Sequence, residues 1–165
     1  MLKVGINTAT RDFLTENEVI EGVKNYLEQK GNTTNKRLIN KSDAEKKERG
    51  VDLVIKLENM QKRGNWYFIE AKGNKRSDGS IMRSSYNTNF RWAVSQIILR
   101  IRVDSRRNNY IYGIAMPKSD IEKCIKLISK NWALKHLKIR LYGAYYDENK
   151  GEFTAKEYLP KDIYD

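Results

Sequence analysis

Two carboxylates and a lysine stand where two apolar runs of the chain begin or end. Asp52 opens the run VDLVI, and Glu70 closes the run WYFI, with Lys72 two residues later. Mg²⁺ prefers oxygen ligands, and one or two carboxylates with substrate phosphate make a usual magnesium site. Such a metal lowers the pKa of a bound water, which a neighbouring lysine can orient or deprotonate. The pattern predicts a site that hydrolyses phosphodiesters with Mg²⁺ or Mn²⁺.

Two paired strands are needed to bring these side chains together. The runs over 51–57 and 65–71 are predicted strands, and a polar turn around 62–64 joins them as a hairpin. Because side chains alternate along a strand, Glu70 and Lys72 lie on one face, where Asp52 meets them if the strands pair. Unpaired charges beside buried runs are costly, and a bound metal would offset that cost. The alternative is that two acids simply sit at strand ends with Lys72 as an ion-pair partner.

The remaining patterns predict an α/β protein. Thr15 and Glu18 form a capping box that opens a helix, and Gly31 is its predicted stop. The other predicted elements are a strand over 35–40, a polar loop over 73–88, a helix over 89–103, a strand over 108–117, a helix over 119–132 opened by a second capping box, and a strand over 138–147 followed by a turn and a polar tail. This order predicts one domain over residues 1–165, with a mixed sheet flanked by helices and the site at strand ends.

Two glutamates of the first helix compete for a place in the site. On a helical wheel Glu16 shares a face with the apolar residues Val23 and Leu27, whereas Glu18 lies nearly opposite. The capping box already explains Glu18. Glu16 is therefore the predicted fourth site residue, and the alternative is that it only complements the helix dipole.

Positive charge is concentrated in one segment of a chain whose formal net charge is +11. Between Lys72 and Arg107 nine basic residues are opposed only by Asp78 and Asp104. Such a balance favours a polyanion as partner, because released counterions drive its binding. Arginines and aromatic residues alternate over 83–92, a mixture that suits phosphates and stacked bases. The predicted nucleic-acid contacts are Lys75, Arg76, Arg83, Arg91 and Arg100; the alternatives are a solvated loop and a merely basic surface.

Several other classes of protein are excluded or disfavoured by composition. The single cysteine, Cys124, excludes a disulfide framework and favours a reducing, cytoplasmic compartment. With one histidine, His136, a zinc site or a Ser-His-Asp triad is disfavoured, and His136 is expected at the end of a surface helix. No leader pattern and no membrane-spanning run is expected.

The segment G-V-D-(x17)-E-A-K, from Gly50 to Lys72, resembles the core of the PD-(D/E)XK nuclease superfamily. The resemblance covers roughly residues 15–115 and implies the restriction-endonuclease-like fold. Val51 replaces the proline of the motif. The resemblance implies that Asp52 and Glu70 bind the metal and that Lys72 serves the attacking water.

The same resemblance implies further roles. Members often carry a glutamate on the helix before the hairpin, which Glu16 would supply, and a glutamine on the helix after E-x-K, for which Gln96 is the candidate. Trp92 and Arg100 share a helical stripe with Gln96, and an ordinary polar flank is the alternative. The implied activity is a metal-dependent endonuclease acting on DNA, as a homodimer by analogy. Two readings stay open beside it: a non-catalytic nucleic-acid-binding module on the same fold, and a basic interaction domain without nucleic acid.

Overall fold

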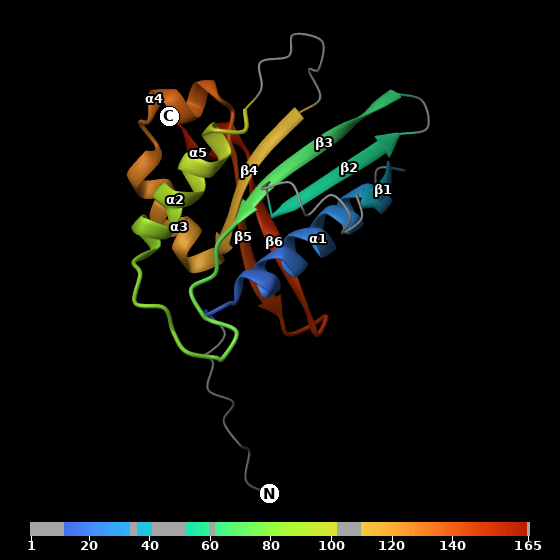
Figure 1. Cartoon of the computed structure of the whole chain (residues 1–165). Coiled ribbons are helices and arrows are strands. Elements are labelled where there is room, and N and C mark those ends of the chain that lie inside the picture. The colour runs from blue at the N-terminus through green and yellow to red at the C-terminus, as the bar shows by residue number, and fades with distance from the viewer. Residues whose placement is uncertain (1–11, 34–35, 41–51, 60–61, 102–109, 165) are drawn as a thin grey trace, which may run out of the picture.

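A mixed sheet of six strands runs through the part of the molecule that the structure describes (Figure 1). The structure is a computed structural model and describes residues 12–33, 36–40, 52–59, 62–101 and 110–164. The strands follow one another across the sheet in chain order: β1 (Lys36–Asn40), β2 (Leu53–Asn59), β3 (Lys62–Ala71), β4 (Tyr110–Pro117), β5 (Arg140–Asp147) and β6 (Glu152–Tyr158). β1, β2 and β3 pair antiparallel, β4 and β5 continue parallel to β3, and β6 returns antiparallel. The predicted α/β class with a mixed sheet is confirmed.

Helices cover the sheet from both faces (Figure 1). The long helix α1 (Glu16–Thr33) packs on one face, against both the first and the last strands. The opposite face carries α2 (Tyr86–Ile98), α3 (Lys118–Ile128), α4 (Trp132–His136) and α5 (Pro160–Ile163). No helix in the described ranges is long and apolar enough to cross a membrane.

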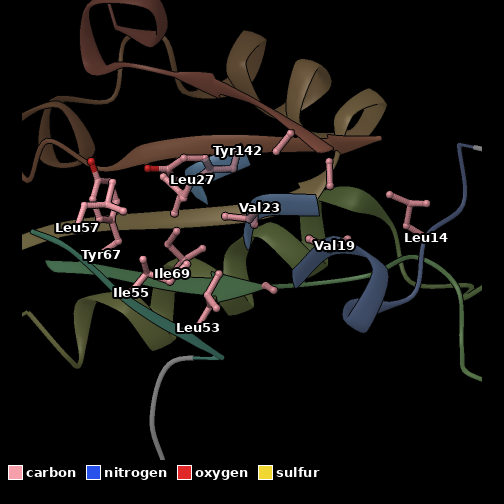
Figure 2. Close-up of a cluster of buried hydrophobic side chains, with 14 residues drawn as sticks. Leu14, Val19, Val23, Leu27, Leu53, Ile55, Leu57, Tyr67, Ile69 and Tyr142 are labelled. Carbon is pink, nitrogen blue, oxygen red and sulfur yellow. The ribbon is translucent and has the colours of Figure 1, made fainter. Parts of the chain in front are cut away.

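Two apolar cores follow from this arrangement, one on each face. Under α1, alternate residues of β2 and β3 meet one stripe of the helix, and Val19, Val23 and Leu27 have no exposed surface (Figure 2). On the other face Ile97 of α2 and Ile121 of α3 pack on β4 and β5. Cys124 lies buried in this second core, as a free thiol. The strand alternation therefore decides which residues face α1 and which face α2.

Several predicted boundaries are wrong. The first helix does not stop at Gly31 but continues to Thr33, and the predicted turn at 62–64 lies inside β3, whose Lys62 pairs with Asn59. The helix predicted over 89–103 begins earlier, at Tyr86, because Ser85 caps it by accepting a hydrogen bond from the Thr88 amide. The helix predicted over 119–132 ends at Ile128, and α4 follows separately. Residues 41–51, 102–103 and 108–109, on which parts of these predictions fall, lie outside the described residues.

One capping box is confirmed and the other is wrong. At the start of α1 the Thr15 amide donates a hydrogen bond of 2.7 Å to the Glu18 carboxylate, and the Glu18 amide donates one of 3.2 Å to the Thr15 hydroxyl. The second box fails because α3 begins at Lys118, with Pro117 before it and no side-chain cap. Glu122 instead accepts a hydrogen bond of 3.0 Å from the Tyr158 hydroxyl.

The predicted polar tail is also wrong, since it forms β6 and α5. Its charged residues hid a strand that buries side chains on both faces of the sheet. Ala155 and Phe153 belong to the core under α1 and Tyr158 to the core on the opposite face, whereas Lys156 is exposed. The buried partners of Glu157, described below, explain why an acid is tolerated in this strand.

A close backbone approach sets the distance between α1 and β6. A Cβ at Gly22 of α1 would lie 2.7 Å from the carbonyl oxygen of Thr154. Alanine is intrinsically a better helix former than glycine by about 1 kcal/mol. Here the backbone of β6 would have to move, and such overpacking costs about 1–3 kcal/mol.

We therefore predict that Gly22→Ala lowers the free energy of unfolding, although helix propensity alone would raise it. Urea denaturation of the variant measures the change. Glu21→Ala, at the exposed neighbouring position of the same helix, is the matched control and should leave stability unchanged or slightly raised. A Gly22→Ala protein as stable as the Glu21→Ala control would contradict the close packing of α1 on β6.

Candidate functional site

Four of the predicted site residues meet around the ammonium group of Lys72. Its Nζ lies 2.6 Å from Oε1 of Glu70, 3.6 Å from Oδ2 of Asp52 and 4.0 Å from Oε2 of Glu16. The three acids come from three different elements: the start of β2, the end of β3 and the first turn of α1. Residues that are 56 positions apart in the chain therefore share one cluster, which is called the acidic cluster below.

The hairpin positions two of these residues directly. β2 and β3 pair so that Leu53 is opposite Ile69, which brings Asp52 beside the end of β3. Oδ2 of Asp52 accepts a hydrogen bond of 2.8 Å from the amide of Ala71, between Glu70 and Lys72. The carboxylate of Asp52 is thus held by the backbone of E-A-K itself, and only partly by ion pairing.

The third acid is brought in by the turn that follows β3. A Cβ at Gly73 would lie 2.5 Å from the amide nitrogen of Glu16, so only glycine lets the start of α1 come this close. The carbonyl of Leu14 accepts hydrogen bonds from the amides of Asn74 and Lys75, at 2.9 and 3.1 Å. These contacts fix the first turn of α1 against the end of β3 and bring Glu16 to Lys72.

Glu18 takes no part in the acidic cluster. Its carboxylate caps α1 through Thr15 and pairs with Lys75 at 3.3 Å. The choice of Glu16 over Glu18 from the helical wheel thus agrees with the geometry. Lys75, predicted as a nucleic-acid contact, takes part in this ion pair, and its predicted contact with nucleic acid stays a prediction.

Arg100 adds a second cation to the cluster. Its guanidinium donates a hydrogen bond of 2.6 Å from Nη1 to Oε2 of Glu70. Glu70 therefore has one basic partner on each carboxylate oxygen, and its side chain is only 2% exposed. The sequence assigned Arg100 to nucleic acid, and an ion pair with Glu70 was not predicted. Since a residue that follows α2 reaches β3, the contact depends on how α2 crosses the sheet.

Burial and mutual repulsion govern the protonation of the acids. Burial raises the pKa of the Glu16 carboxyl above its usual 4.5, and the charge of Asp52 raises it further, whereas Lys72 lowers it. Burial also raises the pKa of Glu70, against the lowering effect of its hydrogen bond with Lys72. Perturbed carboxylates of this kind concentrate at functional sites.

Lys72 is held in its charged form. Burial alone would lower the pKa of its ammonium group, but the hydrogen bond to Glu70 and the charges of Asp52 and Glu16 outweigh burial and raise it. At neutral pH Nζ therefore donates hydrogen bonds and does not accept a proton. Of the two predicted roles, orienting a water fits this state, and deprotonating it does not.

The acidic cluster suits a hard divalent cation in the kind of its donors. All three acids offer carboxylate oxygens, which Mg²⁺ and Mn²⁺ prefer, and the cluster holds one more negative than positive charge. Oε1 of Gln96, one helical turn before Arg100, is buried and has no hydrogen-bond partner among the residues that the structure describes. As the side chains stand, no three His, Cys, Asp or Glu residues in the described ranges are close enough to hold a metal ion. The acids surround the ammonium group of Lys72. A metal ion would therefore have to replace Lys72 or Arg100 as the partner of one Glu70 oxygen.

The remaining predicted residues are more scattered. Arg76, Arg83 and Arg91 are exposed and are available to a polyanion. Trp92, on the same stripe as Gln96, is 63% exposed. Phe90, one of the aromatic residues between 83 and 92, is 5% exposed and belongs to the core between α2 and the sheet. His136 ends α4, exposed as expected, with its ring 4.0 Å from that of Trp132.

A second charged cluster lies under the later part of α1, about 15–21 Å along the helix from Glu16. Glu157 of β6, whose side chain is 6% exposed, accepts hydrogen bonds from Lys30, from Arg140 at 2.8 Å and from the hydroxyls of Tyr26 and Tyr142 at 3.0 Å each. Burial opposes the charge of Glu157, but its basic partners prevail and lower its pKa. An acid whose charge is fully compensated joins α1 to β5 and β6, and its role is structural.

Comparison of the chain with protein-family models, with curated proteins and with solved structures finds no match. The fold and the acidic cluster therefore carry the functional argument by themselves.

The opposite pKa shifts of Glu16 and Glu18 give a matched test of the electrostatics. The pKa of Glu16 is raised in the fold, so its charge destabilises the protein above that pKa, and this cost is lost as the pH falls through it. The pKa of Glu18 is lowered by its bonds with Thr15 and Lys75, despite burial, so its charge stabilises the protein above 4.5, and this gain is lost at lower pH.

At pH 7 we expect Glu16→Gln to raise the melting temperature and Glu18→Gln to lower it, the latter by about 2–4 °C, since the ion pair with Lys75 is only partly buried. The difference for Glu16→Gln should shrink as the pH falls through the raised pKa of Glu16 towards 4.5, and the difference for Glu18→Gln only as the pH falls below 4.5 and through the lowered pKa of Glu18. Thermal melts of the three proteins across this range measure the effect. Two variants that shift stability in the same direction would contradict the geometry described for the first turn of α1.

Proposed function

We propose that this protein is a metal-dependent nuclease of PD-(D/E)XK type that hydrolyses phosphodiester bonds in DNA. The observation that carries the proposal is the convergence of Glu16, Asp52, Glu70 and Lys72 at one edge of the sheet. Strand alternation predicts that Asp52, Glu70 and Lys72 share one site, and the helical wheel adds Glu16.

The architecture around the cluster supports the same proposal. A helix carrying a glutamate, then an antiparallel hairpin with an acid at its first strand and E-x-K at the end of the next, is the order that the family pattern implies. The next helix and a strand parallel to β3 complete a restriction-endonuclease-like core as proposed here. The charge of +11 supports a polyanionic substrate.

Each residue of the cluster has a distinct role in this proposal. Asp52 and Glu70 hold the divalent ion, with Glu16 as the acid nearest to solvent, its side chain 49% exposed. The ion, when bound, supplies a Lewis acid for phosphate oxygens and a water of lowered pKa. Lys72 keeps its proton, orients the attacking water by donating a hydrogen bond from Nζ, and offsets charge that develops on the phosphate. Arg100 keeps the carboxylate of Glu70 in place.

One observation favours a second function, a non-catalytic nucleic-acid-binding module on the same fold. Both oxygens of Glu70 are already satisfied by Lys72 and Arg100. If these ion pairs persist in the presence of divalent metal, the cluster is a structural charge network and the basic surface alone binds nucleic acid. The two functions differ in whether metal binds and whether DNA is cut.

Cleavage of labelled DNA tests the catalytic proposal. With Mg²⁺ or Mn²⁺ the wild type should cut DNA, with EDTA it should not, and Lys72→Ala should lower the rate by about 10²–10³-fold, the usual cost of losing a group that stabilises transition-state charge. Linear, branched and single-stranded DNA are compared. Lys123→Ala, which removes a lysine paired with Asp120 at 3.5 Å on α3, is the control and should cut like the wild type. Salt-sensitive DNA binding without metal-dependent cutting would establish the binding module instead.

Metal binding can be measured without any cleavage. With Mn²⁺ at 100 times its dissociation constant, stability should rise by about 2.7 kcal/mol. Asp52→Asn can still accept the Ala71 amide but lacks a carboxylate, so the rise in its melting temperature with Mn²⁺ should be much smaller. Asp78→Asn, in the exposed loop after β3, is the matched control and should respond like the wild type. Equal responses of Asp52→Asn and the wild type would remove Asp52 from the metal site.

A further inference from the structure

The ammonium group of Lys72 is the point at which the acidic cluster converges. Its Nζ lies 2.6 Å from Glu70, 3.6 Å from Asp52 and 4.0 Å from Glu16. Arg100 also meets the cluster, but among the described residues it pairs with Glu70 alone, through Oε2. The two cations are therefore not equivalent, since only Lys72 stands at a place from which all three carboxylates are reached.

A divalent ion shared by Asp52 and Glu70 competes with Lys72 for this place. Mg²⁺ lies about 2.1 Å from each ligand oxygen. Nζ is 2.6 Å from Oε1 of Glu70, so an ion on that oxygen would lie within about 5 Å of the ammonium group. Two cations this close in a half-buried cluster repel each other strongly. The carboxylates are arranged around the ammonium group, and no three His, Cys, Asp or Glu residues in the described ranges are close enough for a metal ion.

The side chain of Lys72 can leave the acids while the fold stays as it is. The Lys72 amide donates a hydrogen bond of 2.9 Å to the carbonyl of Ala115 in β4, which fixes the backbone, whereas Nζ ends a flexible four-carbon stem. Oε2 of Glu70 is held by Arg100 at 2.6 Å, independently of the bond between Oε1 and Lys72. An exchange of partners at Oε1 therefore leaves both the sheet and one anchor of Glu70 in place.

We propose that the ammonium group of Lys72 takes the place of the divalent cation when none is bound, and that the cation displaces it from Oε1 of Glu70 while Arg100 keeps Oε2. The inference rests on the proposed function and deepens it, because it names the contact that metal binding breaks. The displaced ammonium group stays positively charged and is free to donate a hydrogen bond to the attacking water. Removing Lys72 should therefore slow cleavage and yet tighten the binding of metal.

Calorimetric titration with Mn²⁺, in the absence of nucleic acid, compares two variants that take one positive partner from Glu70. Lys72→Ala and Arg100→Ala remove the same charge, and each removes a bond of 2.6 Å, so a general effect of charge would tighten Mn²⁺ binding equally in both. The exchange predicts that Lys72→Ala binds Mn²⁺ about 10- to 150-fold more tightly than Arg100→Ala, the fold-change that corresponds to one hydrogen bond between charged groups.

Each outcome of the titration decides between the two basic partners of Glu70. Equal affinities of the two variants would show an effect of charge only, and tighter binding by Arg100→Ala would show that the metal takes the place of Arg100. Either result overturns the inference. If neither variant nor the wild type binds Mn²⁺, the inference is overturned together with the metal site. Binding by Lys72→Ala alone would support the inference most directly, because the ammonium group would then exclude the ion from the wild type.

A second experiment uses the unaltered protein, so it does not depend on whether Lys72→Ala folds. A limiting amount of acetic anhydride labels the lysines with and without Mg²⁺, and mass spectrometry compares Lys72 with Lys75. Lys75 is a matched reference, because its side chain is 25% exposed against 20% for Lys72, and it pairs with Glu18 at 3.3 Å. Mg²⁺ should raise the labelling of Lys72 several-fold relative to Lys75, since release from the carboxylates exposes Nζ. An unchanged ratio at a saturating Mg²⁺ concentration overturns the exchange.

The exchange and the nuclease fail separately. Both experiments are read without nucleic acid, so a protein that exchanges Lys72 for metal but never cuts DNA keeps the exchange and loses the nuclease. A protein that cuts DNA with Mg²⁺, while Lys72→Ala binds Mn²⁺ no more tightly than Arg100→Ala, keeps the nuclease and loses the exchange.

Discussion

Burying the carboxylate of Glu70 is the constraint on which the site depends. A charge with 1% of its residue surface exposed is costly unless partners satisfy it. Lys72 and Arg100 supply those partners from the end of β3 and from the segment after α2. The contact with Arg100 holds the end of α2 beside β3. The contact with Lys72 holds the chain that follows β3. Asp52 and Glu16 then meet the cluster through the backbone, by way of Ala71 and Gly73.

A comparison of the two buried glutamates shows why one cluster is assigned chemistry and the other is not. Glu157 is surrounded by donors alone, and its pKa is lowered, so its charge contributes to stability. Burial, together with the charge of Asp52, raises the pKa of Glu70 despite its two basic partners. Carboxylates that lie close together repel one another, so a bound positive charge stabilises them. A protein can use such a group to bind a cation, although the repulsion lowers its stability when no cation is bound.

The sequence predicted which residues meet at the site better than it predicted the boundaries of the elements that carry them. Asp52, Glu70 and Lys72 follow from strand alternation, and Glu16 from a helical wheel, because both patterns are local periodicities. Arg100 was assigned to nucleic acid, since nothing in the sequence says that α2 ends beside β3. β6 was missed because Glu157 looks solvated until its partners, distant in the chain, are known.

The packing of α1 has a consequence for the order in which the molecule assembles during synthesis. Glu16 lies far before β5 and β6 in the chain, yet its helix rests on both strands. α1 can take its final position only after the strand that ends at Tyr158 has been synthesised. The acidic cluster therefore closes late, and a nascent chain that still lacks β6 carries its acids apart from one another.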